Sequence, residues 1–219
     1  MTNSEKIDQF IANNDESTIK DYHDKLFENL TVLNEKEDKL IVWEIVIIFL
    51  YLFAGNLKIE NLNLGPVSIT DTSLLLKLIP LVFVYVLYDL NSVSYQKQEI
   101  LLAFNIISKE RFAKMCKEDN FNSYLSRIYK PYAFTNSISN FIREKANLIE
   151  ISFGLLVLIP VMVIWIIPFC IVISMIIDVY TNHMNDLLGK LSFFITTWLT
   201  VVVVYQMIAR TIMIYRKEN

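Results

Sequence analysis

The sequence ISFGLLVLIPVMVIWIIPFCIVISMII occupies residues 151–177 and contains no charged side chain. Because an α-helix rises about 1.5 Å per residue, a helix of this length is roughly 40 Å long, which exceeds the ~30 Å hydrocarbon core of a bilayer. Apolar side chains would surround it on every side, whereas a surface helix of a soluble protein keeps a polar face. The segment therefore predicts a transmembrane helix.

Three further apolar segments, at residues 41–57, 72–88 and 191–209, have lengths suited to a bilayer. The whole chain is 54% hydrophobic, above the roughly 45–50% typical of soluble domains. Only four glycines and five prolines occur in 219 residues, which argues against a loop-rich or all-β fold. The sequence predicts an all-α polytopic membrane protein with four transmembrane helices in two hairpins and a helical cytoplasmic layer.

The apolar and polar segments alternate along the chain, and this alternation predicts five regions. They are a cytoplasmic amphipathic helical arm (1–39), a first transmembrane hairpin (40–90), a cytoplasmic helical region (91–148), a second transmembrane hairpin (149–213) and a cytoplasmic tail (214–219).

The positive charges predict the orientation of these regions. Seventeen of the twenty lysines and arginines lie in residues 1–40, 89–150 and 210–219. Cytoplasmic loops of membrane proteins carry an excess of lysine and arginine. We therefore expect a multi-pass protein of the inner (plasma) membrane with both termini in the cytoplasm, and the composition is typical of a bacterium.

Local breaks in the pattern predict two details. The pair Asn13-Asn14 interrupts the first helical pattern, and Asp15 can cap a second helix. In the link at residues 58–70, Gly65-Pro66 is a turn signal flanked by partly alternating apolar residues, which predicts a small hairpin at the outer face.

Several functional classes find no support in the sequence. The cysteines (Cys116, Cys170) and histidines (His23, His183) lack metal-binding spacing, and no nucleotide-binding or hydrolase motif is present. With a net charge of -3, the chain has no basic character that would indicate a nucleic-acid partner. We expect no enzyme, no cofactor and no cleaved signal peptide, so the first apolar segment would act as an uncleaved signal anchor.

A group of charged residues lies near the predicted cytoplasmic ends of the spans, namely Glu44, Asp89, Glu150 and Arg210. They are either interfacial charges or, in an assembly of several copies, one of the three acids repeats as a ring at the mouth of a cation pore, with Arg210 at the same level. Lys77 is an intramembrane charge near the outer face, and its side chain is long enough to reach the headgroups. Because Glu44 and Lys77 lie at opposite ends of an antiparallel hairpin, we expect no pairing between them.

Two prolines, Pro160 and Pro168, interrupt the opening segment. Each removes a backbone donor and frees a carbonyl group. They predict either a bend that fits a long helix into the bilayer or a hinge for gating.

Two functions fit this organisation. The first is a homo-oligomeric channel or membrane-permeabilising effector that is gated through its cytoplasmic helices. The second is a non-conducting scaffold or accessory subunit that recruits a soluble cytoplasmic partner through the apolar faces of those helices. Four helices enclose little room for a substrate path, which favours an oligomer for the first function.

Overall fold

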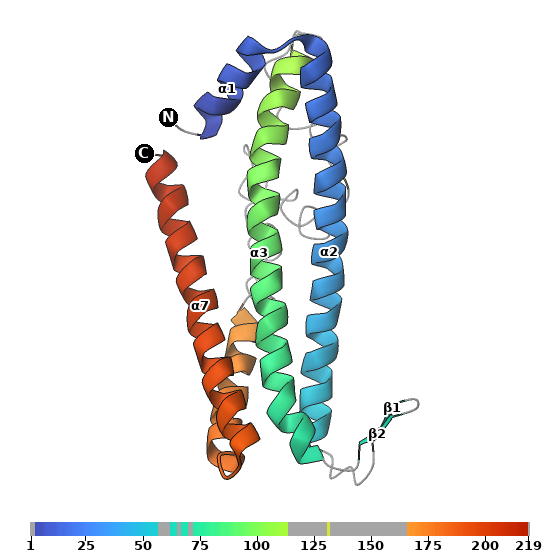
Figure 1. Ribbon diagram of the computed structural model, residues 1–219, viewed down its shortest axis with the longest axis vertical. Helices are drawn as coiled ribbons and strands as arrows, with labels where there is room; N and C mark the ends of the chain where they lie inside the picture. Colours follow the sequence, from blue (N-terminus) through green and yellow to red (C-terminus); the bar gives the residue numbers. More distant parts are fainter. Residues whose placement is uncertain are drawn as a thin grey trace, which may run out of the picture. The chain divides into compact units, whose positions relative to one another are not determined.

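The computed structural model describes residues 3–56, 62–64, 67–69, 72–113, 131 and 166–218. The described chain is helical apart from one short hairpin (Figure 1). Its labelled helices are α1 (Asn3–Asn13), α2 (Glu16–Asn56), α3 (Thr72–Ala113) and α7 (Leu187–Glu218), and Ile166–Asn182 is also helical. The predicted helical class is confirmed for these residues.

The break between the first two helices and the strand pairing of the hairpin are confirmed, whereas the position of the hairpin at the outer face stays a prediction. The Asn14 side chain donates to the Phe10 carbonyl at the end of α1, and Asp15 accepts a hydrogen bond from the Thr18 amide at the start of α2. In the link, strands β1 (Leu62–Leu64) and β2 (Val67–Ile69) pair antiparallel, with Leu64 opposite Val67. Gly65 and Pro66, which the sequence predicted as the turn, lie outside the described residues.

The helices are longer than the predicted spans. α2 continues without a break from the predicted arm into the first apolar segment, and α3 continues from the second apolar segment to Ala113. Pro80 lies buried inside α3 without ending it.

Two helices, Ser73–Lys109 and Leu187–Ala209, are long and apolar enough to cross a membrane. The helix Ile166–Asn182 is apolar but shorter, and residues 151–165 of the opening segment lie outside the described residues. The four-span topology and the orientation therefore stay predictions.

The chain divides into two compact units. Unit 1 comprises Met1–Asp38 and Ser92–Val161, and unit 2 comprises Lys39–Asn91 and Met162–Asn219. α2 and α3 each contribute residues to both units.

Unit 1 has a small core where α1, α2 and α3 meet. Leu26, Ala103, Phe104 and Ile107 are buried together, and Ile7 and Ile11 of α1 pack against them. Because Ile7 and Ile11 lie four residues apart, they share one face of α1. The Phe10 and Tyr22 rings, 4.9 Å apart, add a second contact between α1 and α2.

Unit 2 has a larger core built from α2, α3, the Ile166–Asn182 helix and α7. Phe83, Val84, Val172 and Met175 are buried at its centre, and Leu199 of α7 packs against it. Large aliphatic and aromatic side chains fill this core.

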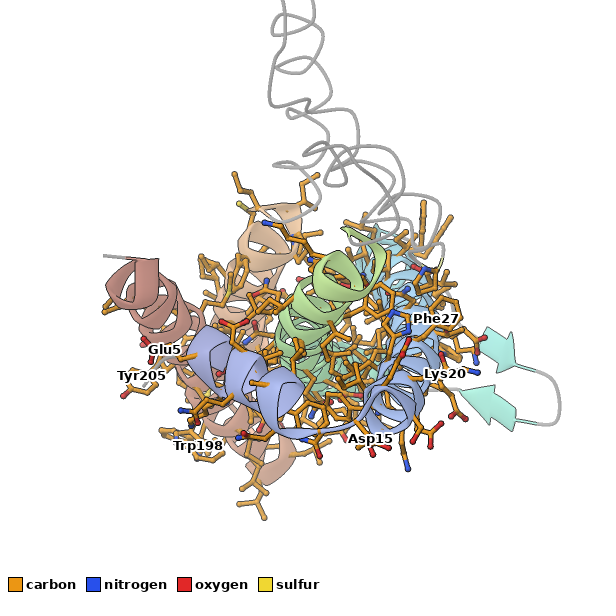
Figure 2. The ribbon with its side chains drawn as sticks, turned by 90° about the horizontal axis from the view of Figure 1, so that it is seen from above. Glu5, Asp15, Lys20, Phe27, Trp198 and Tyr205 are labelled. Atoms are coloured by element: carbon orange, nitrogen blue, oxygen red, sulfur yellow. The ribbon has the colours of Figure 1, made fainter. Side chains whose placement is uncertain are left out.

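The exteriors of the two units differ in chemistry. Four large exposed apolar side chains belong to unit 1 (Tyr22, Phe27, Val32 and Leu102), and all the others among the described residues belong to unit 2. Figure 2 shows two of them, Trp198 and Tyr205, which project outward from α7 and are 65% and 69% exposed.

Candidate functional site

The buried side of α2 carries an unusual number of polar residues. One row of its buried or half-buried residues recurs every seven residues, so the members of this row share one face of the helix. They are His23, Leu30, Glu37, Glu44 and Tyr51. Four of these five side chains are polar or ionisable, so each needs a partner once it leaves water.

Glu37 has such partners in unit 1. Its Oε2 atom lies 2.5 Å from Lys97 Nζ, and its Oε1 atom accepts a hydrogen bond of 2.9 Å from the Ser94 hydroxyl. The side chains of Glu37 and Lys97 are 4% and 7% exposed. Because Ser94 and Lys97 are three residues apart on α3, one face of that helix satisfies both carboxylate oxygens.

His23 forms a second buried polar contact in unit 1. Its Nε2 atom lies 3.0 Å from the Ser108 hydroxyl, and its ring stacks on Phe104 with centroids 4.7 Å apart. Its Nδ1 atom lies 3.5 Å from the carboxylate of Asp24. The contact fastens the first part of α2 to α3.

Glu44 lies seven residues beyond Glu37 on the same helix, in unit 2. The residue is 5% exposed, and its buried Oε1 atom accepts no hydrogen bond from any group in the described part of the chain. On the same face, Ile47 belongs to the core of unit 2 and Tyr51 packs against it. Glu44 therefore points into an apolar interior.

Tyr51 and Asn91 make polar contacts at opposite ends of unit 2. The Tyr51 hydroxyl donates to Asp178 at 3.4 Å, and the Asn91 amide donates to Gln206 of α7 at the same distance. The first contact joins α2 to the Ile166–Asn182 helix, and the second joins α3 to α7.

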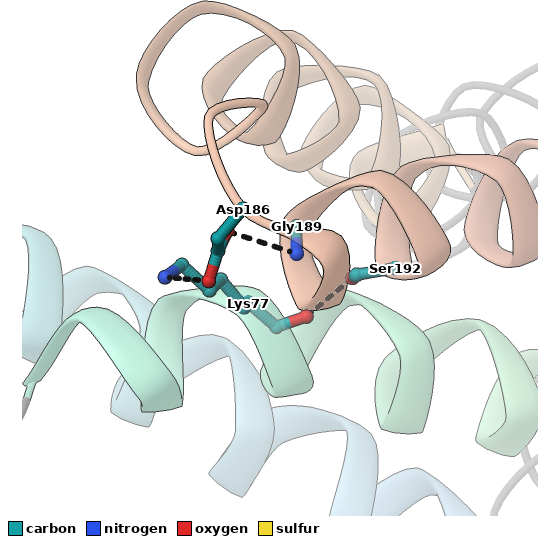
Figure 3. Close-up of polar contacts among 4 residues, drawn as sticks. All are labelled: Lys77, Asp186, Gly189 and Ser192. Carbon is teal, nitrogen blue, oxygen red and sulfur yellow. Dashed lines mark hydrogen bonds and ion pairs between the residues drawn. The ribbon is translucent and has the colours of Figure 1, made fainter.

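Lys77 takes part in a group of polar contacts between α3 and the start of α7 (Figure 3). Its Nζ atom lies 2.8 Å from Asp186, which also accepts from the Gly189 amide, and the Ser192 hydroxyl donates to the Lys77 carbonyl. Hydrogen bonding to Lys77 lowers the pKa of Asp186. A β-carbon on Gly189 would meet the His183 carbonyl at 1.6 Å, so this turn requires glycine.

These contacts also fix the direction of two helices. Lys77 and Asn91 are fourteen residues apart on α3, and their partners Ser192 and Gln206 are fourteen residues apart on α7. The two helices therefore run parallel. The predicted topology requires the same direction for its second and fourth spans.

The structure places only part of the predicted set of functional residues. Glu44 is buried and Asp89 is half-buried in unit 2, whereas Glu150 and the side chain of Arg210 lie outside the described residues. Pro168 is buried in the Ile166–Asn182 helix, and Pro160 lies outside the described part. The pore-mouth and hinge roles remain predictions.

Sequence patterns do not predict the partners of the buried groups. Lys97 lies 60 residues from Glu37, and Asp186 lies 109 residues from Lys77. The seven-residue spacing of polar residues on α2 was the available signal, because it places Glu37 and Glu44 on the face that also holds Leu30.

No cluster of three or more histidine, cysteine or acidic side chains with metal-binding geometry occurs among the described residues. No protein-family model, curated protein sequence or solved structure matches the chain. Functional inference therefore rests on the geometry of the chain itself.

Proposed function

We propose that this protein is an integral membrane protein that acts as a homo-oligomeric channel or membrane-permeabilising effector, gated through its cytoplasmic helices. In this proposal unit 2 lies in the bilayer with four spans, and unit 1 forms the cytoplasmic layer. The observation that carries the proposal is the apolar exterior of unit 2.

Burial within α7 supports the membrane location. Only 22% of its most apolar window is buried inside the protein, whereas the core helix of a soluble protein is mostly buried. The exposed residues include aliphatic and aromatic side chains from Leu187 to Ile212. Soluble monomers seldom expose apolar patches of this extent.

The filled core of unit 2 supports an assembly rather than a monomer as the conducting form. Fully buried Phe83, Val84 and Met175 leave apolar contacts at its centre, and conduction requires a polar or wettable path. We infer that the path forms between copies. Because Glu44 faces the interior of unit 2, Asp89 and Glu150 are the better candidates for acids at the pore mouth.

One face of α7 supplies a candidate contact between copies. Its exposed apolar side chains recur in alternating steps of three and four residues, the spacing with which helices pack along a seam. They are Leu187, Leu191, Phe194, Trp198, Val201, Tyr205, Ile208 and Ile212.

The test is ion flux in proteoliposomes that contain the purified full-length chain, with oligomeric state measured by native mass spectrometry. We expect several copies per complex and a cation flux that protein-free liposomes lack. Trp198→Ala with Tyr205→Ala should weaken both, whereas Phe49→Ala, which removes an exposed aromatic from α2, is the matched control. A monomer without flux that co-purifies with a soluble protein would contradict the proposal and favour the scaffold function.

A further inference from the structure

Glu44 differs from Glu37, the other buried glutamate of the described chain, in the surroundings of its carboxyl group. Its Oε1 atom is buried and accepts no hydrogen bond from the described residues. By contrast, Glu37 has a cation and a hydroxyl group on its two oxygens. A buried charge needs such partners, because desolvation strongly disfavours an isolated ionised carboxylate.

No described cation of unit 2 neutralises Glu44. Lys77 pairs with Asp186, and Lys39 and Lys190 are exposed. The other titratable side chains described on the helices that share this core with α2 add no positive charge. They are Tyr85, Tyr88 and Asp89 on α3, Cys170, Asp178 and Tyr180 on the Ile166–Asn182 helix, and Tyr205 on α7.

The apolar neighbourhood leaves one simple way to remove the charge. Glu44 shares its face of α2 with the core residue Ile47, and the surrounding hydrocarbon of a bilayer supplies no counterion. A bound proton converts the carboxylate to a neutral acid, which needs no cation beside it.

We propose that Glu44 is a proton-binding site inside unit 2 and that its carboxyl group holds a proton at neutral pH. The inference rests on the membrane location proposed above but not on conduction. The site takes a proton as its ligand and is a modification site for apolar carbodiimides, which enter hydrocarbon and react with protonated carboxyl groups.

The modification chemistry is an addition. The carboxyl oxygen bonds to the central carbon of the carbodiimide, and the carboxyl proton moves to one of its nitrogens. The resulting O-acylisourea rearranges by transfer of the acyl group to nitrogen, which gives a stable N-acylurea. All atoms of both reactants are retained, and nothing is oxidised or reduced.

The experiment uses the full chain in lipid nanodiscs at neutral pH, treated with N,N′-dicyclohexylcarbodiimide and analysed by peptide mass spectrometry. We expect one added reagent molecule on Glu44 and none on Glu37, which is an internal control because Lys97 and Ser94 hold it as a carboxylate. Glu44→Asp should keep the modification, and Glu44→Gln should abolish it. Equal modification of Glu37 and Glu44 would overturn the proposal.

Infrared spectroscopy tests the protonation of Glu44 independently if the reagent does not reach the site. The spectrum of the wild type minus that of Glu44→Gln should show the carbonyl stretch of a protonated carboxylic acid, and absence of that band overturns the proposal. Flux measured on the same preparation separates the two proposals. Modified Glu44 without flux contradicts the channel alone, and flux without a protonated Glu44 contradicts the proton site alone.

Discussion

Glu37 and Glu44 are two buried glutamates on one face of one helix, and they have opposite surroundings. Glu37 lies in unit 1, where Lys97 and Ser94 satisfy both of its oxygens. Glu44 lies in unit 2, where its Oε1 atom has no described partner. Two turns of helix therefore separate a carboxyl group with two described partners from one whose Oε1 atom has none.

The difference follows the exteriors of the two units. Unit 1 exposes mainly polar side chains and buries a neutralised charge, as a water-facing helical layer does. Unit 2 exposes apolar side chains on each of its helices and fills its core with apolar groups. This contrast supports the proposal that unit 2 lies in a bilayer and that unit 1 faces water.

The largest expected effect is the loss of the cation in unit 1. Lys97→Met leaves the Glu37 carboxylate buried without its counterion, so we expect the free energy of unfolding to fall by about 3–5 kcal/mol. Chemical denaturation followed by circular dichroism, in the detergent used for purification, measures the change.

The double variant Glu37→Leu/Lys97→Met is the control for this prediction. It removes both charges, and we expect it to recover most of the lost stability. A loss below about 1 kcal/mol for Lys97→Met alone would mean that the pair behaves as an exposed ion pair, and the contrast with Glu44 would disappear.

The second expected effect has the opposite sign and concerns unit 2. Glu44→Leu removes a buried polar group without a described partner, so we expect the free energy of unfolding to rise by about 1–3 kcal/mol. The same denaturation experiment measures it, with Phe49→Leu as a control for a side chain on the exposed side of α2. If Glu44→Leu destabilises the protein as much as Lys97→Met does, Glu44 has a stabilising partner.

Sequence patterns predicted the features that depend on neighbouring residues. Asn14 and Asp15 identified the break between α1 and α2, because capping side chains act within four residues. Gly65-Pro66 predicted the hairpin because a turn signal and the strands that flank it are adjacent in the sequence. In both cases the residues that indicate the structural feature lie next to that feature in the sequence.

Contacts between distant segments could not be predicted in this way. Periodicity assigns Glu37 to a face of α2 but does not identify Lys97, sixty residues away, as its partner. Depth along the helix predicted an interfacial charge for Glu44, whereas the structure turns that side chain toward the core. A hydropathy profile predicts how far a residue lies along an apolar segment. The side of the helix that contacts neighbouring helices depends on packing between segments that are distant in the sequence.

A smaller effect is expected for the buried histidine in unit 1. Ser108→Ala removes the hydroxyl 3.0 Å from His23 Nε2, and we expect a loss of about 0.5–1.5 kcal/mol in the free energy of unfolding. Lys109→Ala, at an exposed neighbouring position, serves as the control. No difference between the two variants would show that the histidine contact adds nothing to unit 1.

The smallest expected effect is a dependence on acidity at the start of α2. Hydrogen bonds from Thr18 and Ser17 lower the pKa of Asp15. A lowered pKa in the folded state means that the stabilisation is present above the unfolded value of about 3.9 and is lost as the pH falls through the folded value. Thermal unfolding between neutral and acidic pH should show this loss in the wild type, whereas Asp15→Asn keeps a capping side chain and should lack this contribution.

Accessibility of single cysteines tests the assignment of the two units to two solvents most directly. In a chain with Cys116 and Cys170 replaced by serine, one cysteine is introduced at an exposed apolar position and treated with a membrane-impermeant maleimide in right-side-out and inverted vesicles. The unit 1 positions are Val32 and Leu102, and the unit 2 positions are Phe49, Val82, Ile173 and Trp198. We predict that Val32→Cys and Leu102→Cys react only in inverted vesicles and that the unit 2 variants react in neither until the protein is denatured. Reaction of the unit 2 cysteines as fast as those of unit 1 would contradict the account.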